Sequence, residues 1–299
     1  MGVLEGVFTV MVTPLTKRGD IDLDGMAKNI DWWVHEGVHG LIALGSTGEF
    51  ASINTEDRMQ VAEHVIDHVA NRVPVLIGAT AETTDEAITL ARHAEEAGAS
   101  GVLVLPSYYY RSKPAEVLAH FKGISDAVNI PIMVYNNPGS TKTDITPEQV
   151  QKLSDLRMVQ YIKESSCDIR RIADIRIRTN DELTVFCGWE DLAYESFVMG
   201  AKGWVSVAAN IVPSLCVRLF NDLVRDNDLK AGWDTYCRLL PVLWLLERSG
   251  KAQVILKFVL DQMGLAGGKA HTPRLPLSER EKSEIAATLS VAGVELGSH

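Results

Sequence analysis

Between residues 7 and 207 the chain alternates short β-branched apolar runs with longer amphipathic stretches. Eight runs have the length and composition of strands, and they span residues 7–12, 40–44, 75–79, 101–105, 132–135, 159–163, 184–187 and 203–207. The stretches between them have a helical pattern, and they span residues 23–36, 55–70, 84–97, 114–128, 147–153, 169–178 and 191–199. Near-continuous apolar runs are typical of parallel strands that are buried on both faces. The alternation therefore predicts an α/β fold, a parallel (β/α)8 barrel.

The pattern changes after about residue 212. Three helical patterns, 213–225, 229–246 and 251–263, follow one another without intervening strands, and residues 277–288 have a helical pattern as well. No linker or low-complexity stretch interrupts the series. We therefore expect a (β/α)8 TIM barrel over residues 1–211 and a C-terminal helical extension over residues 212–299 that packs on the barrel.

Charge and cysteine content exclude several classes of protein. The 299 residues include 29 Lys and Arg against 39 Asp and Glu, a formal net charge of −10. Without a basic cluster, neither nucleic acid nor an anionic membrane is an expected partner, and no apolar run approaches the roughly 18 residues that cross a bilayer.

The four cysteines form no C-x-x-C pair, which favours a reducing compartment. The first residues lack the basic and apolar segments of a signal peptide, so we expect a cytoplasmic protein.

Two neighbouring strands of the predicted barrel end on reactive side chains. Lys163 ends the run 159–163, and Tyr135 ends the run 132–135. Burial disfavours the charged form of an amine, and a neutral lysine can form a Schiff base with a ketone. In the alternative interpretation, neither residue is catalytic. The lysine is simply a solvent-exposed residue at the end of a strand, and the tyrosine is a core residue whose hydroxyl has a hydrogen-bond partner. Because barrel enzymes carry their chemistry at the C-terminal ends of the strands, the predicted fold favours the catalytic interpretation.

Three further strand ends carry residues suited to a substrate. After the second strand, Gly45-Ser46-Thr47-Gly48-Glu49 offers backbone N–H groups and hydroxyls to an anion, although it could be an ordinary tight turn. Three tyrosines, residues 108–110, follow the fourth strand and suit either a proton relay or a subunit contact. Small residues near Gly188 and Val205, at the ends of strands seven and eight, leave room for a substrate.

One pair of residues suggests a metal site but does not complete one. His64 and His68 are spaced to lie on one face of a helix, as metal-binding histidines often are. They fall in the middle of an outer helix, away from the strand ends, and no third ligand is evident. We therefore expect a solvated helix face and no metal site.

Together these segments resemble the dihydrodipicolinate synthase / N-acetylneuraminate lyase family. The likeness covers nearly the whole chain and depends on Gly45-Ser46-Thr47-Gly48-Glu49, the loop around Tyr109, Tyr135-Asn136-Asn137-Pro138 and Tyr161-Ile162-Lys163-Glu164-Ser165. The resemblance implies a lyase of the class I aldolase type that acts on pyruvate or a related small 2-oxo acid. It also implies that neither a metal nor another cofactor is used, because the substrate is held as a covalent imine.

The resemblance assigns a role to each matching residue. Lys163 is the Schiff-base lysine, and Tyr135 is the acid/base phenol above it. Ser46 or Thr47 holds the substrate carboxylate and relays protons. Tyr109 reaches into the site of a neighbouring subunit, which implies a homodimer or a homotetramer built as a dimer of dimers. The expected substrate-binding positions are Thr47, Gly48, Gly188, Val205 and Ser140.

The chain departs from the lysine-pathway synthases of this family at Ser140. Those synthases have an arginine there that grips a substrate carboxylate, and a serine cannot replace a bidentate guanidinium. Arg111 or Lys142 could supply a positive charge instead, but neither occupies that place in the motif. Glu82 and Thr55 also differ from the residues that bind feedback lysine in some synthases.

Several functions stay open at this point. The leading hypothesis is a Schiff-base lyase that acts on a 2-oxo acid. The alternatives within the family are a true 4-hydroxy-tetrahydrodipicolinate synthase, a dehydratase or a deaminase. A catalytically silent regulator that binds a 2-oxo acid is disfavoured because Lys163, Tyr135 and Thr47 are all present. A metal-dependent hydrolase is disfavoured because the strand ends lack clustered carboxylates and histidines.

Overall fold

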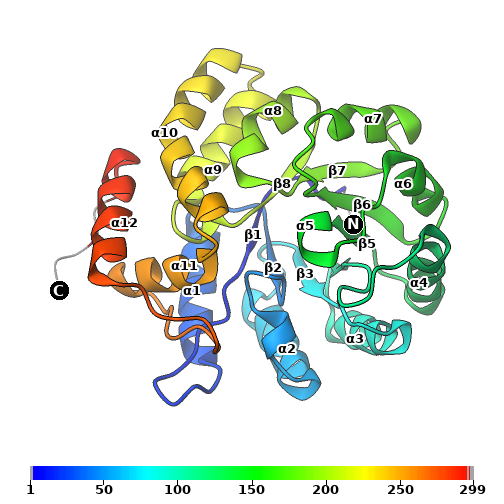
Figure 1. The fold of residues 1–299 in the computed structure, drawn as a ribbon, viewed down its shortest axis with the longest axis horizontal. Helices are drawn as coiled ribbons and strands as arrows, with labels where there is room; N and C mark the ends of the chain where they lie inside the picture. Colours follow the sequence, from blue (N-terminus) through cyan, green and yellow to red (C-terminus); the bar gives the residue numbers. More distant parts are fainter. Residues whose placement is uncertain (1–2, 295, 297–299) are drawn as a thin grey trace.

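A closed barrel of eight parallel strands forms the centre of the computed structural model, which describes residues 3–294 and 296 (Figure 1). Each strand pairs with the next one along the chain, and β8 closes the barrel against β1. The strands are β1 Gly6–Val10, β2 Gly40–Ala43, β3 Val75–Gly78, β4 Gly101–Val104, β5 Ile132–Asn136, β6 Val159–Glu164, β7 Thr184–Cys187 and β8 Gly203–Ser206. The barrel predicted from the alternation is confirmed.

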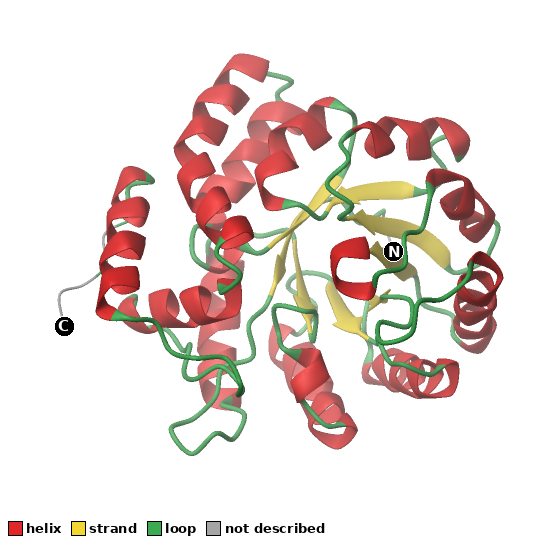
Figure 2. Cartoon of the chain, in the orientation of Figure 1, coloured by secondary structure: helices red, strands yellow, loops and turns green. Residues whose placement is uncertain are grey.

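Helices follow the strands and surround the barrel, as Figure 2 shows. Residues at the helix starts explain where several of them begin. Asn54 accepts the N–H of Asp57 at the start of α2, and Pro114 and Pro147 occupy the first positions of α4 and α6, where the fixed φ of proline suits a helix. These outer helices are α1 Leu23–His35, α2 Thr55–Val69, α3 Thr84–Ala97, α4 Pro114–Ala127, α6 Pro147–Ser154, α7 Arg170–Arg178, α8 Ala193–Val198 and α9 Pro213–Phe220.

Three local details differ from the expected pattern. The helix expected at 191–199 begins as a 3-10 turn, η2 Glu190–Leu192, because the Glu190 side chain turns inward to bind backbone N–H groups after β8. A one-turn helix, α5 Pro138–Thr141, follows β5, and the Asn137 side chain caps it by accepting the N–H of Ser140. The segment expected as one helix at 213–225 continues from α9 into a π-helical turn, η4 Asn221–Arg225.

A register shift between β5 and β6 decides which residues face each other at the site. Ile132 pairs with Val159, but Met133 pairs with Tyr161, so β6 accommodates one extra residue. Bulges of this kind re-aim side chains near active sites. Through the shift, Tyr135 lies opposite Lys163; with an unbroken register it would lie opposite the preceding residue.

Large and small residues alternate inside the barrel. Phe8 and Phe186 meet edge to face with their ring centroids 5.4 Å apart. Each ring lies against a glycine on the neighbouring strand: Phe8 pairs with Gly40, and Phe186 pairs with Gly203. A Cβ at either glycine would overlap the ring. The interior is therefore a packed core, and a ligand has space only at the strand ends.

The helices after β8 gather on one side of the barrel (Figure 1). They are η3 Ala208–Asn210, α9, η4, α10 Leu229–Arg248, α11 Ala252–Gln262 and α12 Glu279–Val291. α9 contacts β1 and α10, and α10 also packs against α12 and η2. The division at residue 212 between barrel and extension stays a prediction. Among the described residues, no helix has the length and apolar content needed to cross a membrane.

Candidate active site

Lys163 and Tyr135 lie side by side at the ends of β6 and β5. The Lys163 side chain is buried, and its Nζ lies 4.0 Å from the centre of the Tyr135 ring. The two residues are direct partners in the parallel pairing of the strands. An amine and a phenol are therefore held together at the end of the barrel where such enzymes carry their chemistry.

The surroundings of Tyr135 favour its ionised form. Burial raises the pKa of the phenol, but the charge of Lys163 and hydrogen bonds with Asn137, Lys163 and Ser165 outweigh it, so the pKa lies below its ordinary value of 10.0. The Asn137 amide donates to the Tyr135 hydroxyl at 2.9 Å. A lowered pKa makes it easier for the phenol to give up its proton, which suits an acid/base residue.

The turn that carries Ser46 and Thr47 has a constrained backbone. Two residues that are not glycine, Leu44 and Glu49, flank it with left-handed φ angles of 59° each. A Cβ at Gly48 would lie 3.0 Å from the carbonyl oxygen of Met11, closer than side chains normally approach. Backbone held in such sparsely populated regions often marks a functional turn, and here it presents Ser46 and Thr47 beside Lys163.

The C-terminal helices fix this turn through Glu49. Its carboxylate is completely buried and pairs with Lys257 of α11, whose Nζ lies 2.6 Å from Oε2. The Lys257 ammonium also donates to the carbonyl of Lys269 at 2.7 Å. The backbone N–H of His271 donates to Glu49 at 2.9 Å, and the Arg274 guanidinium lies 3.3 Å away. The loop after β2 and the C-terminal extension are thus joined by a buried ion pair.

Gly188 leaves space for the lysine. A Cβ at this position would lie 2.7 Å from Cγ and 2.9 Å from Cε of Lys163, and it would overlap the Ser165 hydroxyl. The Ser165 hydroxyl donates to the Gly188 carbonyl at 2.9 Å. Gly188 is therefore needed for the packing of the Lys163 side chain.

Two carboxylates lie on the β7 side of the site. Burial, and then the nearby Glu247 charge, raise the pKa of Glu190 to about 7. Glu190 accepts backbone N–H groups of Val207 at 2.6 Å and Ala208 at 2.9 Å, which holds the loop after β8. Glu247 of α10 is half-buried and accepts the N–H of Glu190 at 2.8 Å, and burial raises its pKa as well.

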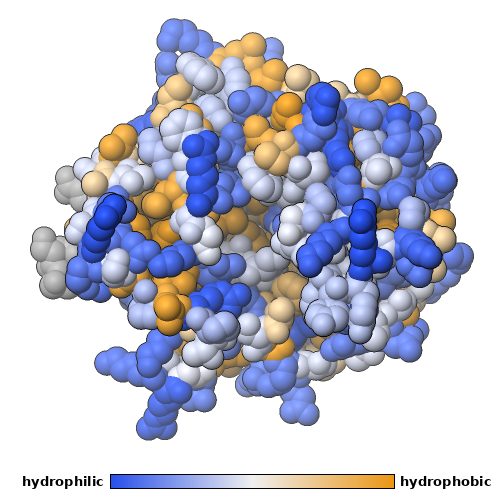
Figure 3. Space-filling model, viewed as in Figure 1, coloured by the Kyte–Doolittle hydropathy of each residue, from blue (hydrophilic) through white to orange (hydrophobic). Residues whose placement is uncertain are grey.

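These residues surround one cavity of about 190 Å³. Its size suits a small molecule rather than a drug-sized ligand. Five of the residues expected from the sequence line it together, namely Lys163, Tyr135, Ser46, Thr47 and Gly188. The other lining residues were not predicted as site residues from the sequence: Asn137, Ser165, Trp189, Glu190, Val207, Leu246, Glu247, Ala252 and Gln253. Figure 3 shows strongly hydrophilic side chains around this face of the molecule, with hydrophobic ones between them beside α10 and α11.

Four expected site residues are not among those that line the cavity. Gly48 shapes the turn, Val205 is buried in β8, and Ser140 is exposed on α5. Tyr109 is 76% exposed. Their roles in substrate binding or catalysis stay predictions.

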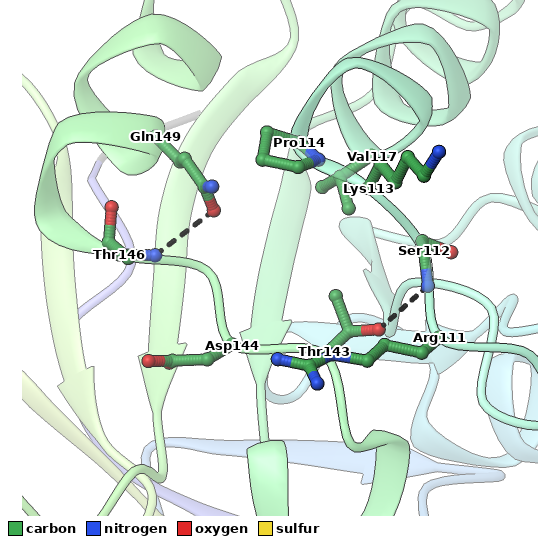
Figure 4. Close-up of a pocket in the computed structure, with 9 residues that line it drawn as sticks. All are labelled: Arg111, Ser112, Lys113, Pro114, Val117, Thr143, Asp144, Thr146 and Gln149. Carbon is green, nitrogen blue, oxygen red and sulfur yellow. Dashed lines mark hydrogen bonds between the residues drawn. The ribbon is translucent and has the colours of Figure 1, made fainter.

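Neither Arg111 nor Lys142, the two cations considered as substitutes for the missing arginine, lines the Lys163 cavity. Arg111 lines a separate cavity of about 550 Å³ between the start of α4 and residues 143–149, where Figure 4 shows it beside Thr143 and Asp144. Lys142 is exposed where α5 ends. Among the described residues that line the Lys163 cavity, the lysine itself is the only cation.

The tyrosine loop is organised around Glu82. Its carboxylate accepts the backbone N–H groups of Tyr108, Tyr109 and Tyr110 and the hydroxyl of Ser107. Burial opposes ionisation, but these hydrogen bonds hold the pKa of Glu82 below its ordinary value. The loop presents Tyr109 and Tyr110 to solvent as an edge-to-face pair. Such exposed aromatic rings suit a contact with another subunit.

The two helical histidines do not form a metal site with a third residue. His64 and His68 stack on each other, and His68 contacts Asp31 at 2.9 Å. Within residues 3–294 and 296, no group of three or more His, Cys, Asp or Glu side chains is arranged to hold an ion. Independence from metal stays a prediction.

The chain resembles known proteins along nearly its whole length. The model of the dihydrodipicolinate synthetase family matches residues 3–292. The 4-hydroxy-tetrahydrodipicolinate synthase of Bartonella bacilliformis is 33% identical over 294 residues, which cover 97% of this chain and 99% of that protein. The chloride-inhibited dihydrodipicolinate synthase of Acinetobacter baumannii, complexed with pyruvate, has a TM-score of 0.92 at 27% identity, with 97% of this chain and 99% of that one covered. A dihydrodipicolinate synthase variant described as monomeric has a TM-score of 0.92 at 29% identity, with 97% of each chain covered.

Proposed function

This chain belongs to the dihydrodipicolinate synthetase family, and on that premise we propose that it is a lyase in which Lys163 forms a Schiff base with a 2-oxo acid. The observation that carries the proposal is the buried Lys163 amine, 4.0 Å from the centre of the Tyr135 ring in a cavity of small-molecule size. The structure of a relative in complex with pyruvate supports a 2-oxo acid as the substrate class.

The proposed reaction begins with imine formation. The neutral Lys163 amine adds to the ketone carbon, and Tyr135 gives a proton to the hydroxyl that leaves as water. The substrate carboxylate lies against the turn that carries Ser46 and Thr47, whose N–H and hydroxyl groups suit an anion. The product of this step is an iminium ion on Lys163.

The iminium nitrogen then accepts the electrons of a breaking bond. The Tyr135 phenolate takes the proton of a hydroxyl at C4, the C3–C4 bond breaks, and an aldehyde leaves. The electron pair passes to the imine nitrogen, which gives an enamine. Protonation at C3 and addition of water then release pyruvate and the free amine, so no cofactor is consumed.

The second substrate distinguishes this proposal from the lysine-pathway synthases. The Bartonella relative is named as such a synthase, which keeps that activity as the principal alternative. Against it, position 140 is a serine and no cation other than Lys163 lines the described cavity. A charged hydrogen bond to a carboxylate contributes roughly 1.5–3 kcal/mol, so aspartate semialdehyde should be a poor second substrate.

Borohydride trapping tests the chemistry. Incubation with pyruvate and borohydride should add one reduced adduct per chain, measured by intact mass, and Lys163→Ala should abolish it. A panel of 2-oxo acids, hydroxylated and sugar-derived acids included, would then rank the substrates. An undiminished adduct in Lys163→Ala would move the imine to another lysine, and no adduct with any acid would favour a silent binding protein.

A coupled assay with pyruvate and aspartate semialdehyde tests the alternative. Synthase activity at a kcat/KM of about 10⁴ M⁻¹s⁻¹ or above, an ordinary enzymatic value, would establish the lysine-pathway reaction. In our proposal, Ser140→Arg raises the synthase rate or leaves it low, and it does not help cleavage of hydroxylated acids. The dehydratase and deaminase alternatives would appear in the same panel as loss of water or ammonia.

We also propose that the enzyme is a cytoplasmic homodimer or homotetramer. The exposed Tyr109 and Tyr110 rings support a subunit contact through the tyrosine loop. One relative is described as monomeric, so family membership alone does not fix the oligomeric state. Sedimentation or light scattering of the wild type and of Tyr109→Ala would test it, and a wild type that stays monomeric at micromolar concentration would refute it.

A further inference from the structure

The charged side chains that line the Lys163 cavity are unevenly distributed around it. Its lining contains two carboxylates, Glu190 and Glu247, and one cation, Lys163. The turn with Ser46 and Thr47 follows β2, whereas both carboxylates lie beside the end of β7. The strand order places β8 and β1 between β7 and β2. A substrate that rests its carboxylate on the β2 turn therefore has Glu190 and Glu247 in another wall of the same cavity, away from that turn.

The two carboxylates differ in what they can still bind. Glu190 is buried, and both of its oxygens accept hydrogen bonds from Ser206, Val207 and Ala208. Glu247 has one partner among the described residues, the backbone N–H of Glu190, which binds Oε1. Its other oxygen is therefore available to a ligand in the cavity.

Resting on the proposed Schiff-base function, we infer that Glu247 selects the substrate by accepting a hydrogen bond from a hydroxyl at the end remote from the 2-oxo acid group. A second carboxylate at that end would meet the Glu247 charge without a cation to pair with it. Specificity through an unpaired like charge is a common device. The substrate class is then a 2-oxo acid with a neutral hydroxylated tail.

Two probes that differ in one group test this inference. Both are five-carbon 2-oxo acids with a hydroxyl at C4; one ends in a hydroxymethyl group and the other in a carboxylate. The measurement is kcat/KM for pyruvate release from each probe. Wild type should prefer the hydroxymethyl acid by about ten- to a hundredfold, the range of one charged hydrogen bond. Glu247→Gln keeps the shape of the side chain and should lower that preference about tenfold, and Glu247→Lys should reverse it.

Glu279→Gln is the matched control, because Glu279 lies on α12 with 89% of its side chain exposed. The same loss of charge there should leave the preference unchanged. Equal or reversed preference in wild type would overturn the inference whether or not the variants fold, and so would a Glu247→Gln preference within threefold of wild type. Borohydride trapping with pyruvate separates the two proposals: an adduct on Lys163 beside an unchanged preference refutes the role of Glu247 alone, and no adduct refutes the Schiff-base function.

Discussion

Replacing Gly188 with alanine tests the packing that positions Lys163. The new Cβ would lie 2.7 Å from Cγ and 2.9 Å from Cε of the lysine, whereas carbon atoms normally approach to about 3.5–4.0 Å. The lysine side chain must therefore move by about 1 Å, and overpacking of this kind destabilises a core by about 1–3 kcal/mol. A misplacement of that size slows a reaction on the order of 10²-fold. The assay is the rate at which pyruvate and borohydride convert the chain to its reduced adduct, read by intact mass, beside a denaturant unfolding curve.

Gly139→Ala is the control for this prediction. Neither glycine has a left-handed φ, so alanine strains the backbone at neither position. A Cβ at Gly139 meets only the Asn137 side chain at 3.4 Å, an ordinary contact, and trapping should stay within threefold of wild type. If Gly188→Ala also traps pyruvate at the wild-type rate, the Lys163 side chain can move aside without losing its reactivity. That result would refute the role of Gly188 in positioning the lysine.

Three other outcomes are expected. Tyr135→Phe should still form the imine but turn over roughly 10²–10⁴-fold more slowly, and a loss below about threefold would reduce Tyr135 to packing. EDTA should leave turnover unchanged, and activity that is lost to EDTA and restored by zinc or magnesium would contradict this. The pKa of Glu190 rises from 4.5 to about 7 on folding, so its contribution to stability is present below pH 4.5 and is lost as the pH rises through about 7. Relative to Glu190→Gln, wild type should lose on the order of 3 kcal/mol of unfolding free energy over that interval, and parallel stability curves for the two proteins would refute the assignment.

The barrel could be predicted because the sequence pattern of each strand and helix lies within a short, continuous segment of the chain. Each strand is a continuous apolar run, and each is short enough to be told from the helical patterns on either side. Lys163 and Tyr135 could be placed at the site for the same reason, since both end a run that the fold orients toward one face. Gly188 could be placed there because it follows a strand directly.

Non-local features could not be predicted. The extra residue between the pairings of Ile132 and Met133 is a property of two strands together, so the sequence of either strand alone does not reveal that Tyr135 faces Lys163. Glu247 and Gln253 enter the cavity because α10 and α11 pack over it, and helical periodicity does not specify which helix face meets a distant loop. The sequence places Glu190 shortly after β7. It does not reveal that the side chain points inward, because that orientation depends on backbone N–H groups of the loop after β8.

The ion pair between Glu49 and Lys257 also bears on when the site can form during synthesis. Glu49 emerges early with β2, and its partner emerges only after all eight strands of the described barrel. Domains begin to fold as the chain is made, but until α11 and residues 269–274 arrive, the turn lacks the groups that hold the Glu49 carboxylate in place. A chain that stalls or is cleaved before Lys257 could therefore complete the barrel and still lack the turn that receives the substrate carboxylate.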